Sequence, residues 1–590
     1  MNETPESFYI RQLSKYQEKL KKVKNQLRLS SGIRLIWFLG VLTICYFLYP
    51  LVQSIISTIL IGAVVFLFLI TRHNRLTYQK RKYLKIIDIN KTELEILKGN
   101  FQHLDTGEEF INPKHEFSYD VDLFGKNSFF QYINRTTTKE SKGLLASILI
   151  GNLTDRINEK QEAIKELAGE KNWRQNFSAI AALLATKTDI NTVIKWVSGY
   201  QPLLPKWMTR FTKIFSILSI VLITGYFFEI INGFVLTAWF FIGLGINGFY
   251  IKKVNKLYAY AGRSKEVFNQ YYQIVEIIEG SDFKSKILLD HHNLLVQKQA
   301  KSSQTLKKFS KILDAFDQRN NMIYGIFGNA FLLWDLTQVT KMDAWIVKYA
   351  SQVKVWFDVV TFFDTYNTLG NFAFNHPNFI FPEIQKNSII IDAVQLGHPM
   401  LSPQKRVDND ILIKKEEFFI TTGANMAGKS TFLRTVALQI IMANTGLPVC
   451  AKSCKYSPVK LMTSMRTSDS LSEESSYFFS ELTQLKRIVD VLEKDHYFVI
   501  LDEILKGTNS KDKAEGSKKF VEKLVRSKAT GIIATHDLSL CKIAKEIDVV
   551  KNKYFDAQIL NDELYFDYKF KDGICQNMNA SFLLNKMGVV

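Results

Sequence analysis

The sequence predicts a C-terminal α/β domain built on a parallel sheet, preceded by an all-α region that two membrane-spanning helical hairpins interrupt. Three observations lead to this fold class. Two long apolar runs lie in the first half of the chain. The segments between and after them carry apolar residues at three- and four-residue spacing, which favours helices. Beyond about residue 385, short β-branched runs alternate with helical runs, as in a parallel sheet flanked by helices.

The first apolar run extends from Leu35 to Thr71, 37 positions without a charged residue. One membrane span needs about 20 residues, so this run predicts two spans that turn near Pro50. The second run, Ile214 to Ile251, contains one charge, Glu229, at its midpoint, where we expect the turn of a second hairpin. A buried hairpin in a soluble core is the alternative, but runs of this length exceed what a one-faced helix requires.

Cations flank both apolar runs, and the chain as a whole has 76 Lys and Arg against 57 Asp and Glu, a formal charge of +19. By the positive-inside tendency, both hairpins enter from the cytoplasm and return to it. The sequence thus predicts a multi-pass cell-membrane protein with cytoplasmic soluble domains. The positive charge also favours a polyanionic partner, either nucleic acid or an acidic lipid surface.

The expected organisation follows from these runs. We expect a basic N-terminal helix over 1–33, a hairpin over 34–72, helical core over 73–205, a second hairpin over 206–255, further helical core and lever over 256–385, and the α/β domain over 386–590. The stretch "FNHPNFIFPEIQ", with its two prolines, marks the last boundary.

The stretch "TTGANMAGKST" carries the clearest chemical signal. It satisfies G-x-x-x-x-G-K-[ST], with a strand-like run before it and a helical run after it, and predicts a site for ATP and Mg²⁺. Glycines allow the tight turn, backbone N–H groups face the phosphates, the lysine supplies positive charge and the serine offers a hydroxyl to Mg²⁺. The residues expected to bind the nucleotide here are Gly423, Asn425, Gly428, Lys429, Ser430 and Thr431.

Two later strand-like runs end in polar residues. The run "YFVILDE" ends in Asp502 and Glu503, and adjacent carboxylates at the end of a buried strand suit a metal and a water molecule. We therefore expect Asp502, with Ser430, on the Mg²⁺ side and Glu503 as the residue that orients or deprotonates the attacking water. The run "GIIATHD" places His536 at the carboxyl end of a third strand, where it is expected to sense the γ-phosphate.

These motifs resemble those of the MutS family of DNA mismatch-repair ATPases. "TGANMAGKST" is similar to the family's TGPNMGGKST, with Ala424 and Ala427 as departures, "DEILKGTNSKD" to DEIGRGTSTYD, and "ATHD" to ATHY. "DSLSEESSYFFSEL" is similar to DDLASGRSTFMVEM, which implies that Ser476 belongs to a signature loop reaching the partner subunit's γ-phosphate. "LGHPML" resembles a segment near the adenine, which implies that His398 lines the nucleotide site.

The resemblance implies a MutS-type ATPase domain, of the P-loop NTPase class, over 386–590, acting in a homodimer. It extends upstream to about Asp120, but no segment before that point is large enough for the family's mismatch-reading domain. The second hairpin stands roughly where the family inserts its DNA clamp, so a membrane anchor is expected to replace it. Glu473 and Glu474 replace a Gly-Arg pair of the signature loop, which bears on the strength of the contact across the dimer.

Two functions follow from these expectations. The first is a membrane-anchored MutS-like ATPase that closes and opens as a dimer and acts on DNA, related to mismatch repair. The second is an ATP-regulated membrane scaffold that applies the same motion to a protein or lipid partner without DNA. An ABC-type transporter fits less well, because four spans with almost no internal polar residues offer little translocation path.

Overall fold

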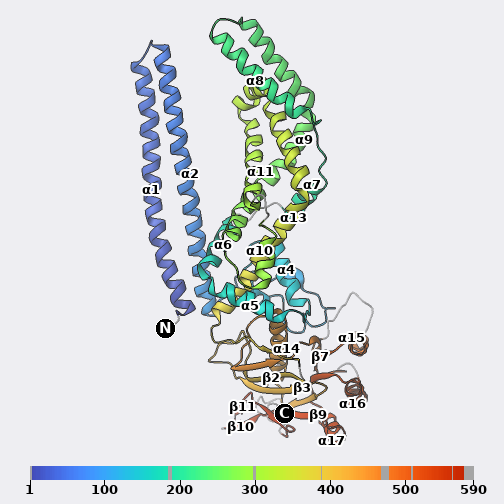
Figure 1. Cartoon of the computed structure of the whole chain (residues 1–590). Helices are drawn as coiled ribbons and strands as arrows, with labels where there is room; N and C mark the ends of the chain where they lie inside the picture. The colour runs from blue at the N-terminus through green and yellow to red at the C-terminus, as the bar shows by residue number, and fades with distance from the viewer. Residues whose placement is uncertain are drawn as a thin grey trace.

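The computed structural model describes residues 3–183, 189–296, 301–386, 388–466, 477–505, 509–560 and 563–576. A C-terminal α/β domain lies at one end of the molecule, and two long helical arms extend away from it in roughly the same direction (Figure 1). A bundle of shorter helices joins the arms to the α/β domain. An all-α region with apolar helices is thus followed by a domain of mixed α/β structure, as the sequence predicts at this coarse level.

The first arm consists of α1 (Pro5–Phe47) and α2 (Val52–Leu97), which lie side by side along their length (Figure 1). The Thr4 side chain accepts a hydrogen bond from the Ser7 amide and caps α1, and Pro5 occupies the first turn, where no amide partner is needed. A Cβ added to Gly62 would lie 2.8 Å from a Val41 methyl group, so the glycine permits the close approach of the two helices. Both helices run without a break through the positions where we expected boundaries, at 33/34 and 72/73.

The second arm contains α8 (Met208–Phe227) and α9 (Gly233–Glu279), and the turn between them contains the exposed Glu229. The C-terminal half of α9 packs against α11 (Ser302–Asp317) and α13 (Trp334–Asn375). Between α11 and α13 the chain forms three short helical turns, which are η2 (Gln318–Asn320), η3 (Ile323–Gly328) and α12 (Asn329–Leu332).

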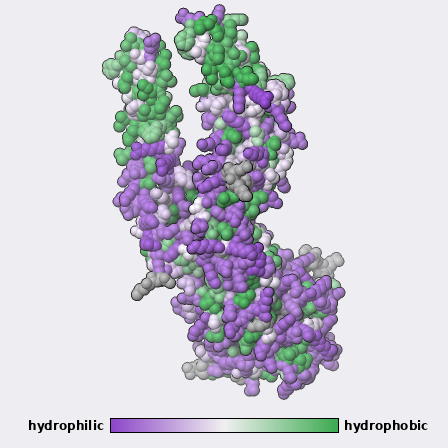
Figure 2. Space-filling view, in the orientation of Figure 1, coloured by the Kyte–Doolittle hydropathy of each residue, from purple (hydrophilic) through white to green (hydrophobic). Residues whose placement is uncertain are grey.

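The far ends of both arms are apolar on their outer surface, whereas the bundle and the α/β domain are mostly polar outside (Figure 2). Within the described part of the chain, α1, α2, α8 and α9 are long and apolar enough to cross a membrane. At most 17% of the apolar window of any of them is buried inside the protein. A helix in a soluble core would bury its apolar face against the rest of the protein, and the apolar windows of these helices are mostly not buried.

The helical bundle is organised around α13, whose side chains Trp356, Phe357, Phe363 and Leu369 are fully buried. The helices around it are α3 (Phe129–Ile133), α4 (Lys139–Ile150), α5 (Ile157–Gly169), α6 (Lys171–Leu183), α7 (Ile190–Ser198) and α10 (Lys286–Asn293). Residues 98–128, which we expected to be mostly helical, form turns with one short helix, η1 (Glu108–Phe110).

The α/β domain is built on a six-stranded sheet of order β12-β9-β4-β8-β7-β6, parallel except for β12. Its strands are β4 (Phe418–Gly423), β6 (Lys460–Ser464), β7 (Tyr497–Asp502), β8 (Thr530–Ala534), β9 (Val550–Phe555) and β12 (Phe570–Asp572). Its helices are α14 (Lys429–Thr445), α15 (Tyr477–Leu492), α16 (Ser510–Arg526) and α17 (Ile543–Glu546), with η4 (Leu540–Lys542) before α17.

A second sheet of order β1-β5-β2-β3 and a hairpin complete the domain. The strands of this sheet are β1 (Glu383–Ile384), β2 (Ile389–Leu396), β3 (Asn409–Lys414) and β5 (Ser453–Tyr456), and the hairpin pairs β10 (Gln558–Leu560) with β11 (Glu563–Tyr565). The second sheet lies next to the start of α14, so that its connecting loops can contribute to a site there.

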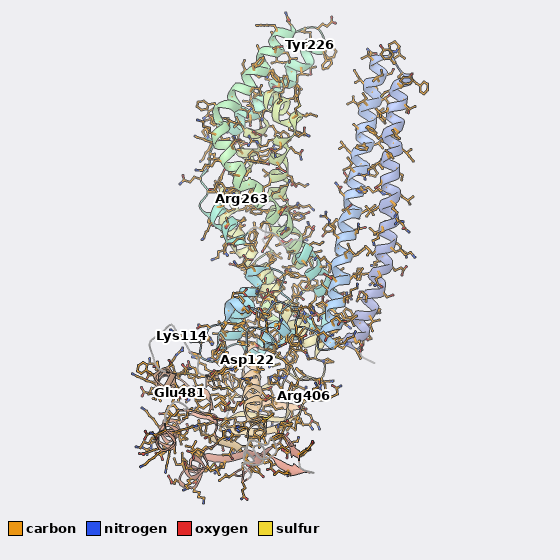
Figure 3. The ribbon with its side chains drawn as sticks, turned by 180° about the vertical axis from the view of Figure 1, so that it is seen from behind. Lys114, Asp122, Tyr226, Arg263, Arg406 and Glu481 are labelled. Carbon is orange, nitrogen blue, oxygen red and sulfur yellow. The ribbon has the colours of Figure 1, made fainter. Side chains whose placement is uncertain are left out.

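The helical bundle is attached to the α/β domain through polar contacts to β6. Asp120 is buried and accepts hydrogen bonds from the Thr463 hydroxyl (2.5 Å) and from the Met465 (3.1 Å) and Arg466 (2.9 Å) amides. Asn152 exchanges two hydrogen bonds with the backbone of Leu461, of 2.8 and 3.0 Å. Figure 3 shows Asp122 at this junction.

Candidate nucleotide-binding site

The glycine-rich loop connects the fully buried strand β4 to helix α14. Gly428 is the last residue before α14 and has φ of 97°, a left-handed conformation that favours glycine. A Cβ at this position would also lie 3.0 Å from a ring carbon of Tyr568. The loop therefore presents its backbone and the amino end of α14 to one cavity, an arrangement that suits phosphate groups.

Lys429 is the first residue of α14, and its side chain is buried within the loop. Its ammonium group donates hydrogen bonds to the carbonyls of Gly423 (2.8 Å) and Ala424 (3.0 Å) and lies 3.3 Å from Nε2 of His536. Burial lowers the pKa of Lys429, while the nearby carboxylates of Asp502 and Glu503 act in the opposite direction. A cation is thus held among acceptors at the base of the cavity.

The carboxyl ends of neighbouring parallel strands bring the expected acidic residues and the histidine to the same place. Asp502 pairs with Ala534 in the β7–β8 register, and the Glu503 amide donates to the Ala534 carbonyl (2.9 Å). The Ser430 hydroxyl donates to an Asp502 carboxylate oxygen at 2.6 Å. His536 Nε2 lies 2.9 Å from a Glu503 carboxylate oxygen.

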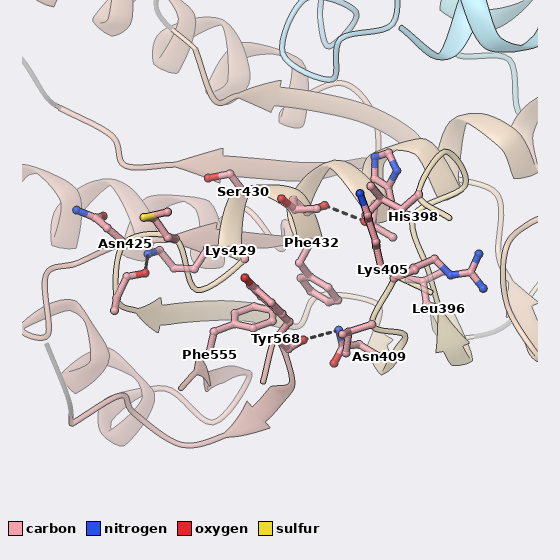
Figure 4. A pocket seen from close by; sticks show the side chains of 18 of the residues that line it. Leu396, His398, Lys405, Asn409, Asn425, Lys429, Ser430, Phe432, Phe555 and Tyr568 are labelled. Atoms are coloured by element: carbon pink, nitrogen blue, oxygen red, sulfur yellow. Dashed lines mark hydrogen bonds between the residues drawn. The ribbon is translucent and has the colours of Figure 1, made fainter. Parts of the chain in front are cut away.

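These residues surround a cavity of about 460 Å³, which is large enough for a nucleotide. Its walls include Asn425, Lys429, Ser430, Thr431, Glu503 and His536 on the side of the loop, and His398, Lys405, Arg406 and Asn409 on the side of the second sheet. Figure 4 shows Phe432 and Tyr568 between these two groups. Residues from at least five separate parts of the chain therefore meet in one cavity.

His398 lies in the connection that follows β2, where the structure places it on the cavity wall. Burial lowers the pKa of His398 to about 4, and the positive charges of Arg434 and Arg406 add to this effect. The ring is therefore neutral at pH 7. Its Nδ1 accepts a hydrogen bond from the Met400 amide at 3.4 Å, so the neutral ring offers the cavity a flat surface and its Nε2–H donor, which suit a nucleobase.

Sequence reasoning did not identify the aromatic wall of the cavity. Tyr568 comes from the segment before β12 and stacks on Phe566, with ring centroids 5.9 Å apart. Asn409 at the start of β3 holds this segment, because its side chain donates to the Tyr568 carbonyl (3.0 Å) and accepts from the Phe570 amide (2.8 Å). The aromatic tail "LYFDYKF" was the available signal, but its position depends on contacts with β3.

Ser476 lies outside the described residues, in the stretch 467–476 between β6 and α15. The structure describes the two ends of this stretch. At its start, the Arg466 guanidinium binds the Asp122 carboxylate at 2.5 Å. Beyond its end, the buried Glu481 carboxylate on α15 accepts a hydrogen bond from the Leu505 amide at 2.6 Å, which ties α15 to the loop after Glu503.

The oxygen groups near the loop fit the ligand preferences of Mg²⁺. Ser430 and Asp502 bring a hydroxyl and a carboxylate within 2.6 Å of each other beside the cavity. Among the described residues no group of three or more His, Cys, Asp and Glu side chains could hold a metal ion by itself. Mg²⁺ is commonly held by one or two protein oxygens together with water and substrate phosphates, so this donor set suits Mg²⁺ bound with ATP.

Comparison with known proteins assigns this domain. Residues 419–584 match the family model of MutS domain V. The chain is 30% identical over 302 residues to the DNA mismatch repair protein MutS of Finegoldia magna, which covers 50% of this chain and 33% of that protein. It is 31% identical over 199 residues to the human MutS protein homolog 4, covering 32% of this chain and 21% of that protein.

A third relative, the DNA mismatch repair protein MutS of Thermodesulfovibrio yellowstonii, is 31% identical over 229 residues, which cover 37% of this chain and 26% of that protein. The matched parts thus span about a third or less of these relatives' own lengths. The family model covers the segments that carry Lys429, Glu503 and His536. The C-terminal part of the chain thus matches MutS domain V, and the relatives that share part of the chain include MutS proteins.

Proposed function

We propose that the chain is a membrane-anchored, mismatch-repair-related ATPase that hydrolyses Mg²⁺-ATP as a homodimer and uses the cycle to move its helical arms. The observation that carries this proposal is the convergence of Lys429, Ser430, Asp502, Glu503 and His536 on one cavity. These residues come from the ends of three adjacent strands, where ligands bind in parallel sheets.

Each group has a role that its surroundings support. Lys429 and the amides of the loop bind the β- and γ-phosphates, while Ser430 and Asp502 hold Mg²⁺, which would neutralise charge on the phosphate oxygens. Glu503 is partly exposed at the cavity and can accept a proton from, or orient, an attacking water molecule. His536, placed between Lys429 and Glu503, is positioned to respond to the γ-phosphate.

Contacts at the junction support transmission of the cycle to the arms. Asp122, in the helical part, binds Arg434 on α14 at 3.1 Å and Arg466 at the end of β6 at 2.5 Å. Arg434 lies five residues after Lys429 on the same helix. A movement of the nucleotide-binding loop or of the segment after β6 therefore acts on residues that the helical bundle holds directly.

Membrane anchoring rests on the exposed apolar ends of both arms. Tyr46, Phe47, Phe227 and Phe249 are each between 78% and 84% exposed, and they lie on helices that are long and apolar enough to cross a membrane. Lipid acyl chains would cover these side chains, so that their apolar surface would not be exposed to water. Both arms leave the bundle on the same side, so two hairpins can enter one membrane from the cytoplasm (Figure 1).

DNA is the polyanionic partner that we propose, because two of the relatives are named DNA mismatch repair proteins and the chain carries a formal charge of +19. The second candidate is a scaffold that moves a protein or lipid partner. It is favoured by the membrane arms, because an apolar arm end in lipid is not available to grip a duplex.

Turnover by purified protein in detergent tests the ATPase. The variant Glu503→Gln keeps the size and hydrogen-bonding capacity of the side chain but removes its basicity, so it should bind ATP and hydrolyse it at least about 100-fold more slowly. Glu493→Gln, an exposed acid at the end of α15, is the matched control and should keep normal turnover. Unchanged turnover in the Glu503 variant would remove this residue from the catalytic role.

The dimer is tested by mixing two inactive variants. Lys429→Ala lacks phosphate binding in its own site, and Ser476→Ala lacks the contribution expected across the dimer. A mixture of the two should regain part of the activity, because some mixed dimers contain one complete site. A mixture that stays as inactive as each variant alone argues against shared sites.

Salt-dependent retention on immobilised DNA distinguishes the two candidate functions. Contacts to phosphates are released as salt rises, so a DNA-binding protein should be retained at low salt on duplex, branched or single-stranded DNA and be eluted as the salt concentration increases. If no DNA retains the protein at low salt, the scaffold is the better description.

A further inference from the structure

The tip between α11 and α13 carries an apolar surface that neither hairpin accounts for. From Asn320 to Trp334 there are 15 residues without a charge, flanked by Arg319 and Asp335. Within this tip, Met322, Ile323 and Phe327 are 72%, 65% and 52% exposed. A soluble tip would expose polar side chains instead, since large apolar patches on a protein surface mark contact with a partner or with lipid.

The tip packs against α8 and α9 at the depth expected for the middle of a membrane. A Cβ on Gly243 would lie 1.9 Å from the Ala330 carbonyl oxygen, so the two backbones are in direct contact. Gly243 is ten residues from the start of α9 at Gly233, about 15 Å along a helix. Because the hydrocarbon layer is about 30 Å thick, a span that begins near Gly233 places this contact close to its midplane.

The exposed apolar surface of the tip is continuous with that of the second hairpin. The Phe240 ring on α9 lies 6.0 Å from the Phe327 ring and 5.7 Å from the Phe331 ring. Phe241 and Ile242, next to Phe240, are 64% and 49% exposed. Whatever covers the exposed face of α9 therefore also meets the tip.

Two backbone carbonyls near the break in the tip have side-chain partners within the protein, as lipid requires. The helical path breaks at Leu333, which has φ of 45° and is fully buried. The carbonyl freed at Leu332 accepts hydrogen bonds from the hydroxyls of Ser216 on α8 (3.2 Å) and Thr337 (3.1 Å). The Asn329 carbonyl accepts from the Asn247 side chain on α9 (2.9 Å).

The charges that flank the tip neutralise one another. Arg319 and Asp335 form an ion pair of 3.0 Å, and both side chains are largely buried. Arg319 also lies over the ring of Tyr258, which is seven residues beyond the end of the apolar run at Ile251. Seven helical residues are about 10 Å, so Tyr258, over which Arg319 lies, is beyond the end of the apolar run.

We propose that residues 321–333 form a third membrane-embedded element, a re-entrant loop that enters from the same side as α8 and α9 and turns within the bilayer. Its exposed face, Met322 to Phe327, contacts lipid acyl chains. This inference rests on the membrane anchoring proposed above and adds an element that is too short to span a bilayer.

Fluorescence quenching of labelled single-cysteine variants tests the loop. Met322→Cys and Phe327→Cys, on a Cys45→Ser background, are labelled with bimane and reconstituted into phosphatidylcholine vesicles. Val221→Cys on α8 is the membrane control, and Val347→Cys on an exposed, more polar part of α13 is the aqueous control. ATP turnover of each variant shows that it is folded. Labelling of the Cys45→Ser protein without an added cysteine measures the background from the buried native cysteines.

Labels at 322 and 327 should be quenched by phospholipids brominated on their acyl chains and protected from aqueous iodide, as at 221, whereas the label at 347 should show the reverse. Iodide quenching at 322 and 327 with lipid quenching at 221 would overturn the re-entrant loop and leave the membrane anchor intact. Iodide quenching at 221 as well would overturn both the re-entrant loop and the membrane anchor.

Discussion

His376, directly after α13, makes the stability of the helical bundle depend on pH. Its Nδ1 lies 2.8 Å from the Phe372 carbonyl and therefore carries the proton, and its Nε2 accepts a hydrogen bond from the Tyr132 hydroxyl at 2.7 Å. The rings of Phe372 and Phe379 contact the imidazole at 4.3 and 4.6 Å between centroids. Burial lowers the pKa of His376 to about 4, and the positive charge of Arg135 adds to this effect.

The direction of the pH dependence follows from the protonation of His376 in the folded and unfolded states. An unfolded histidine has a pKa of about 6.5, so above that pH both states are neutral and His376 adds no pH dependence. Between pH 6.5 and 4 the unfolded chain binds a proton that the folded bundle excludes, and the free energy of unfolding falls. One pKa unit corresponds to about 1.4 kcal/mol, so a change from pH 7 to pH 5 should cost about 2 kcal/mol.

Urea unfolding of the detergent-solubilised protein at pH 7 and pH 5 measures this effect. Other titrating groups contribute equally to the wild type and to His376→Gln, so the difference between their pH dependences isolates His376. The variant should lose about 2 kcal/mol less than the wild type. His103→Gln, which changes an exposed histidine, is the control and should behave as the wild type. Equal losses in all three proteins would refute the reasoning.

Three further substitutions test the site and its connection to the bundle. Gly428→Ala places a side chain at a left-handed backbone position, 3.0 Å from a ring carbon of Tyr568. This variant should lose detectable ATP binding, as measured with a fluorescent nucleotide. Wild-type affinity would contradict the loop geometry. Tyr568→Ala removes an aromatic wall and should weaken ATP binding by about 1 kcal/mol, roughly fivefold, with Tyr565→Ala as an exposed control. Asp122→Asn should change stability by less than about 1 kcal/mol, because its ion pairs are partly exposed, but should reduce the ATP-dependent change in distance between spin labels on the two arms.

The parts of the molecule that sequence reasoning predicts are those that local patterns determine. The loop with Lys429 and Ser430 is specified by glycines and by the strand and helix on either side of it. Asp502, Glu503 and His536 follow strand-like runs, and parallel strands bring such ends together without knowledge of the rest of the fold. The second apolar run likewise predicts the turn at Glu229, since one charge interrupts two helix lengths.

The parts that the sequence leaves open depend on contacts between distant segments. Tyr568 reaches the cavity because Asn409, far away in the chain, holds its backbone, and no local pattern specifies this pairing. The apolar stretch between Arg319 and Asp335 is too short for a span, and its composition is equally compatible with a buried core segment. Its proposed depth in the membrane follows from contacts with α8 and α9, such as that of Ala330 with Gly243.

The junction connects the helical bundle to two parts of the α/β domain, the strand β6 and the helix α14. Asp120 and Asn152 hold the bundle to the backbone of β6, and the buried Asp120 contacts are lost only if the bundle separates from the sheet. Strand β6 leads through Arg466 into residues 467–476, where Ser476 is expected to reach the partner subunit's γ-phosphate. The link from Asp122 to Arg434 on α14 is by contrast a partly exposed ion pair, which can rearrange at little cost. In the proposed dimer, the arms of each protomer would therefore respond to ATP in the partner's site through β6, and to ATP in their own site through α14, whose end packs against α5 at Gly446.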